Sequence, residues 1–221
     1  MAETGTRTVE RALTLLAAVA EGGGTLSQLA RATELSPSTA SRLLATLAGK
    51  ELVRRDEHGR YGAGARLRQL AAAALRSDPI HELAGPHLVA LARETGETAN
   101  LAVAADGERV VYLRQAASPK LVQTASWAGR TIPRRGTALG AALGGTVGDG
   151  GYVARAGAVE PDVTSIAAPV YGPDGLVAGA ISVLAPTYRT SASGIEACGV
   201  AVARHAGELS RSLGYLEVAA A

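Results

Sequence analysis

The stretch Ser36–Lys50, SPSTASRLLATLAGK, constrains the fold of this chain more than any other, because it combines a helix-start signal with two different helix faces. Ser36 is of the residue type that caps helix N-termini by accepting a backbone N–H. Pro37 follows at the first helical position, where a missing N–H costs nothing. Three leucines recur at helical spacing and predict one buried stripe: Leu43, Leu44 and Leu47.

The opposite face of this predicted helix carries short hydroxyls and one guanidinium: Ser38, Thr39, Ser41, Arg42 and Thr46. Hydroxyls and arginine are the groups that reach phosphates and base edges. Taken alone, the pattern fits equally well an amphipathic helix with a solvated polar face. The neighbouring segments therefore decide between the two interpretations.

The segments before Ser36 predict two more helices. Residues 8–20 place apolar side chains near one face, and Gly22–Gly24 ends that helix. Thr25–Gln28 has the S/T-x-x-E/Q form of a capping box, which opens a second helix through about Ala32. Two short helices joined by a three- to four-residue turn are typical of a helix-turn-helix, whose second helix enters the DNA major groove.

After Lys50 the period of the sequence changes from 3.6 to 2. Residues 52–55 and 60–63 predict two strands around a turn that contains Gly59, which completes a winged helix-turn-helix. Three arginines of this wing are placed to touch phosphates, although an exposed hairpin without a partner would look the same. The conjunction favours DNA binding through Thr25, Ser36, Ser38, Thr39, Ser41, Arg42, Thr46, Arg54, Arg55 and Arg60.

The charge distribution agrees with this assignment. Residues 1–76 hold eleven Lys/Arg against seven Asp/Glu, whereas the remainder holds eleven against thirteen. Residues 65–75 are rich in strong helix formers and predict a linker helix, which ends at Ser77-Asp78-Pro79. We therefore expect a DNA-binding domain at 1–64, a linker at 65–78 and a second domain at 79–221.

The second domain reads as an α+β layout of strands flanked by helices. Helices are predicted at 81–95, 136–143 and 193–213, and strands at 98–104, 109–114, 121–127, 165–171 and 176–184. The first helix is expected to bury Leu83, Ala84, Leu88 and Leu91, and the last Val200, Ala203, Leu209 and Leu213. Residues 144–151, GGTVGDGG, predict a flexible loop.

Composition excludes several other classes of protein. The 221 residues contain no apolar run long enough to span a membrane and no apolar signal-peptide region near Met1. The single cysteine, Cys198, excludes an intramolecular disulfide, fits a reducing cytoplasm and has no charged neighbour to activate it. His81 and His87 lie six residues apart, which does not align them as metal ligands, and His205 is expected to be structural. We therefore expect no catalytic residue, cofactor or metal site.

Several motifs resemble the IclR family of bacterial transcriptional regulators, in order along nearly the whole chain. They are Arg11-Ala12-Leu13 with Leu15-Leu16, Leu35–Thr39 with Arg42–Leu44 and Leu47, Tyr61–Gly64, Gly151–Ala154 with Glu160, Ile166–Val170 and Ala180–Val183. The resemblance implies an N-terminal winged helix, a C-terminal effector domain of GAF-like α/β form, and a cytoplasmic homodimer or homotetramer.

The resemblance also implies an effector pocket, whose residues are carried over by position: Thr124, Ser126, Trp127, Thr137, Ala138, Leu139, Gly140, Val163, Ser165, Ser182 and Leu184. Such a cup is small and mostly apolar, with hydroxyls and backbone amides suited to a neutral, carboxylate-bearing or aromatic metabolite. The helix start near Gly136 would offer free amides to a carboxylate. The alternative for each of these hydroxyls is that it belongs to an ordinary strand residue, forms a local hydrogen bond and does not contact a ligand.

The chain departs from the family at one place. Relatives normally carry a helical segment that closes over the pocket before the Gly-Tyr motif, and here only Gly145–Gly150 span that interval. This predicts a more open cup, a different ligand or lost effector binding.

The resulting expectation is a DNA-binding regulator controlled by a small molecule through the linker helix. Whether it acts as a repressor or an activator stays open. Two alternatives belong to other classes: a small-molecule enzyme of the α+β domain, and a sensor whose winged helix contacts protein.

Overall fold

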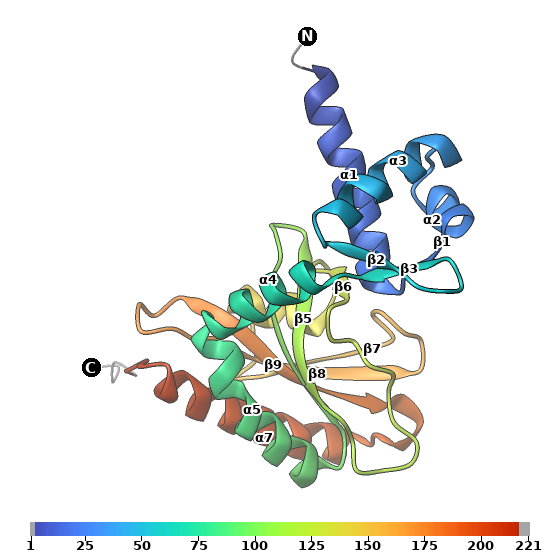
Figure 1. The fold of residues 1–221 in the computed structure, drawn as a ribbon. Coiled ribbons are helices and arrows are strands. Elements are labelled where there is room, and N and C mark those ends of the chain that lie inside the picture. Colours follow the sequence, from blue (N-terminus) through green and yellow to red (C-terminus); the bar gives the residue numbers. More distant parts are fainter. Residues whose placement is uncertain (1–2, 217–221) are drawn as a thin grey trace. The chain divides into compact units, whose positions relative to one another are not determined.

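The computed structural model describes residues 3–216 and divides the chain into two compact units, Met1–Ser77 and Asp78–Ala221 (Figure 1). Each unit is described by itself. In the part of the chain that the structure describes, no helix has the length and apolar character needed to cross a membrane.

The first unit is a winged helix-turn-helix, as the sequence predicts. Its elements are α1 (Glu3–Glu21), β1 (Gly24–Thr25), α2 (Leu26–Ala32), α3 (Pro37–Gly49), β2 (Val53–Arg55), β3 (Arg60–Ala63) and α4 (Ala65–Arg76). The three strands form one antiparallel sheet in the order β1-β3-β2. The sequence analysis did not predict β1, because a strand of two residues is too short to show a periodic pattern.

One hydrophobic core holds the first unit together. Leu15 and Val19 of α1, Leu29 of α2, and Leu44 of α3 with Val53 of β2 are all buried in it. The three leucines of α3 that share one face, Leu43, Leu44 and Leu47, all belong to this core. Their burial leaves the polar face of α3 directed outward. In contrast, none of the twelve residues of α4 is buried.

The second unit is built on a six-stranded antiparallel sheet. Its elements are α5 (Pro79–Thr95), β4 (Thr98–Ala104), β5 (Arg109–Ala116), β6 (Thr131–Pro133), α6 (Ala138–Leu143), β7 (Val153–Ala156), β8 (Val163–Tyr171), β9 (Val177–Pro186), the 3₁₀ turn η1 (Thr187–Arg189) and α7 (Ala192–Ser212). The strand order is β6-β5-β4-β9-β8-β7.

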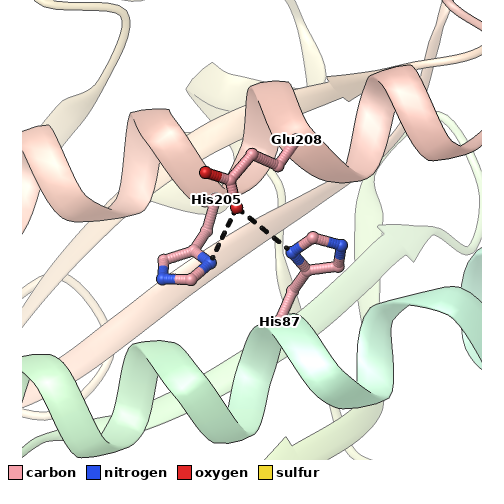
Figure 2. Close-up of side chains that lie close together, drawn as sticks. All are labelled: His87, His205 and Glu208. Atoms are coloured by element: carbon pink, nitrogen blue, oxygen red, sulfur yellow. Dashed lines mark ion pairs between the residues drawn. The ribbon is translucent and has the colours of Figure 1, made fainter.

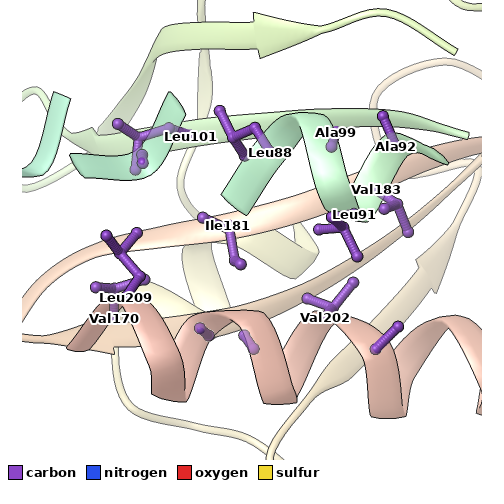
Figure 3. Close-up of a cluster of buried hydrophobic side chains, with 14 of the residues drawn as sticks. Leu88, Leu91, Ala92, Ala99, Leu101, Val170, Ile181, Val183, Val202 and Leu209 are labelled. Atoms are coloured by element: carbon purple, nitrogen blue, oxygen red, sulfur yellow. The ribbon is translucent and has the colours of Figure 1, made fainter. Parts of the chain in front are cut away.

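Helices cover both faces of this sheet. On one face α5 and α7 pack together, and Leu88, Leu91 and Val202 meet Ile181 and Val183 of β9 (Figure 3). On the other face the short helix α6 packs against residues that alternate with those, such as Ala180 of β9 and Ala167 of β8. The side-chain alternation of β-strands therefore separates two cores, one on each face of the sheet.

The structure corrects three predictions for the second unit. Residues 121–127 form no strand, and Leu121 is fully exposed because no neighbouring strand pairs with this segment. The prediction also missed β6 and β7, which are only three and four residues long. Two expected core residues are on the surface: Leu83 of α5 and Val200 of α7 are 37% and 58% exposed.

Candidate functional site

The helix-turn-helix is fixed by reciprocal capping at the start of α2. The Thr25 hydroxyl accepts a hydrogen bond from the Gln28 backbone N–H at 3.4 Å, and the Gln28 side chain accepts one from the Thr25 backbone N–H at 2.9 Å. Glu34, in the turn, has a left-handed φ of 54°. The predicted capping box is therefore present, and the Thr25 hydroxyl, a predicted DNA contact, is committed to it.

The polar face of α3 is where the sequence places it. Ser36, Ser38, Ser41, Arg42 and Thr46 are exposed. The Ser36 hydroxyl accepts from the Thr39 backbone N–H at 3.3 Å and donates to the Thr39 hydroxyl at 2.9 Å, so it caps the helix. The Thr46 hydroxyl donates to the Arg42 carbonyl at 3.0 Å. The Arg42 side chain is exposed on this face.

The wing places three exposed arginines on one hairpin: Arg54, Arg55 and Arg60. The hairpin turn is held by Asp56, whose carboxylate accepts from the backbone N–H of Arg60 at 2.8 Å and of His58 at 3.0 Å. These hydrogen bonds, that of Arg60 first, lower the pKa of Asp56. Arg55 lies 5.7 Å from the centre of the Tyr61 ring. The wing is thus a shaped, positively charged loop.

A narrow cavity opens in the second unit, on the sheet face that α6 covers. Its empty volume, which includes the open mouth, is about 390 Å³. Its walls come from β5, β6, the start of α6, the β7–β8 hairpin and β9, through Tyr112, Trp127, Ile132, Thr137, Ala138, Leu139, Arg155, Ala158, Val159, Glu160, Val163, Ser165 and Leu184.

Seven of the eleven residues predicted for the effector pocket line this cavity: Trp127, Thr137, Ala138, Leu139, Val163, Ser165 and Leu184. Thr124 and Ser126 do not line it, although Trp127 of the same non-strand segment does. Gly140 is buried behind the lining, where an added Cβ would meet the Arg134 carbonyl oxygen. Ser182 lies beneath the cavity, on the same face of β9 as Leu184.

Six lining residues escaped the sequence analysis: Tyr112, Ile132, Arg155, Ala158, Val159 and Glu160. The alternation of 109–116 carried a signal for Tyr112, because it predicts a strand with every second residue on one face. The hairpin residues 158–160 gave no such signal. They close one side of the cavity, although residues 144–152 form no helix there.

The cavity wall contains two aromatic rings. The centres of the Tyr112 and Trp127 rings are 5.6 Å apart, with the rings tilted by 42°. The Trp127 backbone N–H donates to the Gln115 side chain at 2.9 Å, and Arg130 stacks 5.5 Å from the Trp127 ring centre. Burial raises the pKa of Tyr112, so its hydroxyl stays protonated at neutral pH.

Polar groups surround this apolar interior. Arg155 and Glu160 bring opposite charges to the exposed rim. Thr137 caps α6 by accepting from the Gly140 N–H at 3.1 Å, which occupies one of the amides that the sequence offered to a carboxylate. Asn100 Oδ1 and Ser182 Oγ are buried with no hydrogen-bond partner among residues 3–216, and these two residues face each other in the β4–β9 pairing.

The fold and these sites define a class: a DNA-binding winged helix-turn-helix protein with a GAF-like α/β domain for small molecules. Residues 8–57 match the profile described as IclR helix-turn-helix domain, and residues 72–149 match that of the bacterial transcriptional regulator IclR C-terminal domain. The chain belongs to the IclR family of transcriptional regulators. The second match ends at residue 149, within the loop that follows α6.

Individual relatives agree with this assignment. The HTH-type transcriptional regulator BhcR of Paracoccus denitrificans is 28% identical, with 93% of this chain and 87% of that protein covered. An IclR regulator of Alicyclobacillus acidocaldarius has a similar fold, with a TM-score of 0.78, 23% identity and 94% and 99% of the chains covered. So does an IclR homologue of Microbacterium hydrocarbonoxydans, solved with 4-hydroxybenzoate: TM-score 0.74, 21% identity and 93% and 98% covered.

Proposed function

We propose that this regulator reads its operator with the polar face of α3 and holds the DNA backbone with the wing. The observation that carries this proposal is the exposed Arg42, flanked by Ser41 and Ser38 on a helix whose opposite face is anchored in the core. Arginine can bind a guanine edge through two hydrogen bonds or can pair with a phosphate. Arg54, Arg55 and Arg60 contact phosphates in this proposal.

Selection of bound fragments from genomic DNA identifies the operator, and fluorescence anisotropy then compares variants. Arg42→Ala is expected to weaken operator binding about five- to 150-fold if Arg42 reads a base, and to relax specificity at that position. If Arg42 pairs with a phosphate, affinity falls on all sequences and the salt slope decreases by about one. Arg93→Ala, an exposed arginine of the second unit, is the control. Unchanged affinity of Arg42→Ala on operator and random duplexes contradicts its assignment.

We further propose that the cavity binds a small aromatic carboxylate. The tilted pair Tyr112 and Trp127 offers a surface for an aromatic ring, and Arg155 at the rim offers a positive charge to a carboxylate. The unpartnered Asn100 and Ser182 oxygens beneath it favour a ligand or a water that can donate hydrogen bonds. The Microbacterium homologue solved with 4-hydroxybenzoate supports this class of ligand.

Calorimetric titration with 4-hydroxybenzoate, benzoate and cyclohexanecarboxylate tests the ligand class. The benzoates are expected to bind more tightly than the cyclohexane analogue, because only they stack as flat rings. Arg155→Gln should weaken benzoate binding at least about tenfold, since it removes a charge-assisted hydrogen bond. Arg93→Gln is the matched control. Equal binding of all three acids, or none, contradicts the proposal for an aromatic carboxylate.

Because ligand binding and operator binding are reciprocally linked, a saturating benzoate should change operator affinity by the same factor as operator changes benzoate affinity. We propose that the protein performs this regulation in the cytoplasm, as a homodimer or homotetramer and without catalytic activity. Two copies supply the paired recognition helices that two half-sites require. Light scattering of the free and operator-bound protein measures how many chains bind one operator. A single chain per operator contradicts the proposed homodimer or homotetramer.

A further inference from the structure

A compact group of three side chains lies away from the cavity, where α5 and α7 pack together. His87 comes from α5, and His205 and Glu208 come from α7, one helical turn apart. The three side chains point toward one another (Figure 2). One oxygen of Glu208, Oε2, lies 3.7 Å from His87 Nδ1 and 3.6 Å from His205 Nδ1. The three atoms lie within 4.8 Å of one another.

The surroundings of His205 allow its Nδ1 to offer a lone pair to this group. Its side chain is only 5% exposed, and its Nε2 lies 3.2 Å from a carboxylate oxygen of Glu94. Its other nitrogen, Nδ1, is buried and has no hydrogen-bond partner in the described part of the chain. In the neutral tautomer that donates Nε2–H to Glu94, Nδ1 carries no proton and is an acceptor, while Arg204 Nη2 also lies 3.3 Å from Nε2. Most metal-binding histidines are held by such a carboxylate.

The other two residues complete the ligand set. Glu208 Oε1 accepts from Arg204 at 3.0 Å, which leaves Oε2 to face both histidines. The His87 side chain is 19% exposed, and its Nδ1 faces Glu208 Oε2. Among the described residues, the ion pairs of this group join two carboxylates, Glu94 and Glu208, to one Arg side chain, Arg204, so neutral histidines leave a net negative charge that favours a cation.

We propose that His87, His205 and Glu208 bind a divalent transition-metal ion of the zinc class, and that Glu94 positions His205 for it. Two imidazoles and one carboxylate are a common ligand set for Zn²⁺, with a fourth place for water. Bonds of about 2.0–2.1 Å in a tetrahedron place neighbouring ligand atoms about 3.4 Å apart. The observed separations of 3.6 and 3.7 Å from Glu208 Oε2 are close to this value, and the two histidine nitrogens, which lie within 4.8 Å of each other, must approach until they match it.

This site is separate from the proposed effector cavity. The helices α5 and α7 cover one face of the sheet, and the cavity opens on the other. The site rests neither on the effector proposal nor on DNA binding. A metal bound here joins α5 to α7 directly.

Calorimetric titration of metal-free full-length protein with Zn²⁺ at pH 7.5 tests the site. The expected result is saturable binding of one Zn²⁺ per chain. His87→Gln and Glu208→Gln should each weaken binding at least about 100-fold, and Glu94→Gln about 10- to 100-fold. His58→Gln, an exposed histidine of the wing, is the matched control and should bind as the parent chain does. Circular dichroism checks that each variant is folded. If Glu208→Gln does not fold, the result for His87→Gln alone decides the test.

X-ray absorption of the zinc-loaded protein provides a second readout. Only nitrogen and oxygen ligands at about 2.0–2.2 Å are expected. A sulfur ligand would identify Cys198 instead and overturn the proposal. The absence of one Zn²⁺ bound per chain would also overturn the proposal. In that case His87, His205 and Glu208 merely share a proton. Binding that survives in the folded His87→Gln variant also overturns it.

Discussion

At the residue scale, the buried carboxylate of Glu97 holds together three segments that are distant in the sequence. Its side chain is 7% exposed. Oε1 accepts from Arg189 Nε at 3.0 Å and from Lys120 Nζ at 2.8 Å, and Oε2 accepts from Arg189 Nη2 at 2.7 Å. The two-fold contact with Arg189 is the geometry in which guanidinium–carboxylate pairs are strongest.

Glu97→Gln should lower the free energy of unfolding by about 2–3 kcal/mol, because it leaves two cations without their counter-charge. This expected loss is smaller than the loss on breaking a fully buried ion pair, because Lys120 is 45% exposed. Urea unfolding measures the loss, and Glu108→Gln, at an exposed position, is the control. A loss no larger than that of the control would show that the pair contributes nothing measurable.

Cys198 offers a second prediction at this scale. Burial raises the pKa of its thiol, and the negative charge of Glu97 raises it further, against an opposing effect of Lys120. A raised thiol pKa means less thiolate at pH 8, so reaction with a disulfide reagent should be at least roughly tenfold slower than in the guanidinium-unfolded chain. The rate should continue to rise above pH 9. Equal rates in the folded and unfolded chain contradict this prediction.

At the scale of elements, the winged helix could be predicted from sequence because its signals are local. The capping box of α2, the Ser36-Pro37 start of α3 and the Gly59 turn of the wing each act over a few residues. The prediction of a strand at 121–127 was wrong because strand formation depends on a non-local signal. Strand formation needs a partner supplied by a distant segment, and no strand pairs with these residues.

The same reasoning explains the incomplete prediction of the sites. The predicted lining residues at the start of α6 and on β8 and β9 were carried over from the family by position, whereas Glu160 of the β7–β8 hairpin belongs to a family motif but was not assigned to the pocket. The sequence analysis considered His87 and His205 separately and did not bring them together with Glu208. His87 is more than 100 residues from the other two, so spacing along the chain gave no metal-site pattern.

The start of α6 permits a prediction about an element. A Cβ on Gly140 would meet the Arg134 carbonyl oxygen and approach Thr137 Oγ1 to 2.9 Å. Gly140→Ala must displace this capping turn, which we expect to cost about 1–3 kcal/mol and to weaken ligand binding in the cavity. Gly49→Ala, where an added Cβ meets nothing within 4 Å, is the matched control. Thermal unfolding with and without benzoate measures both effects, and an unchanged stability would contradict the close approach.

At the scale of the whole molecule, the three hydrophobic cores do not cross the boundary after Ser77. One core uses residues up to Tyr61, and the other two use residues from Ile80 onward. A fragment of residues 78–221 should therefore fold by itself, unfold cooperatively and bind Zn²⁺ as proposed for the full chain. Near-ultraviolet circular dichroism and calorimetry test this. A fragment without fixed tertiary structure would show that the second unit depends on the first.

The exposed helix α4 has a consequence for how the two units are coupled. None of its twelve residues is buried, so its sequence is not fixed by packing and its length can be altered. Each residue inserted into an α-helix turns everything beyond it by about 100° and advances it by about 1.5 Å. One alanine inserted after Ala72 therefore changes the helical phase between the units, whereas seven nearly restore it. Control of operator binding by ligand should then be lost with one insertion and largely recovered with seven.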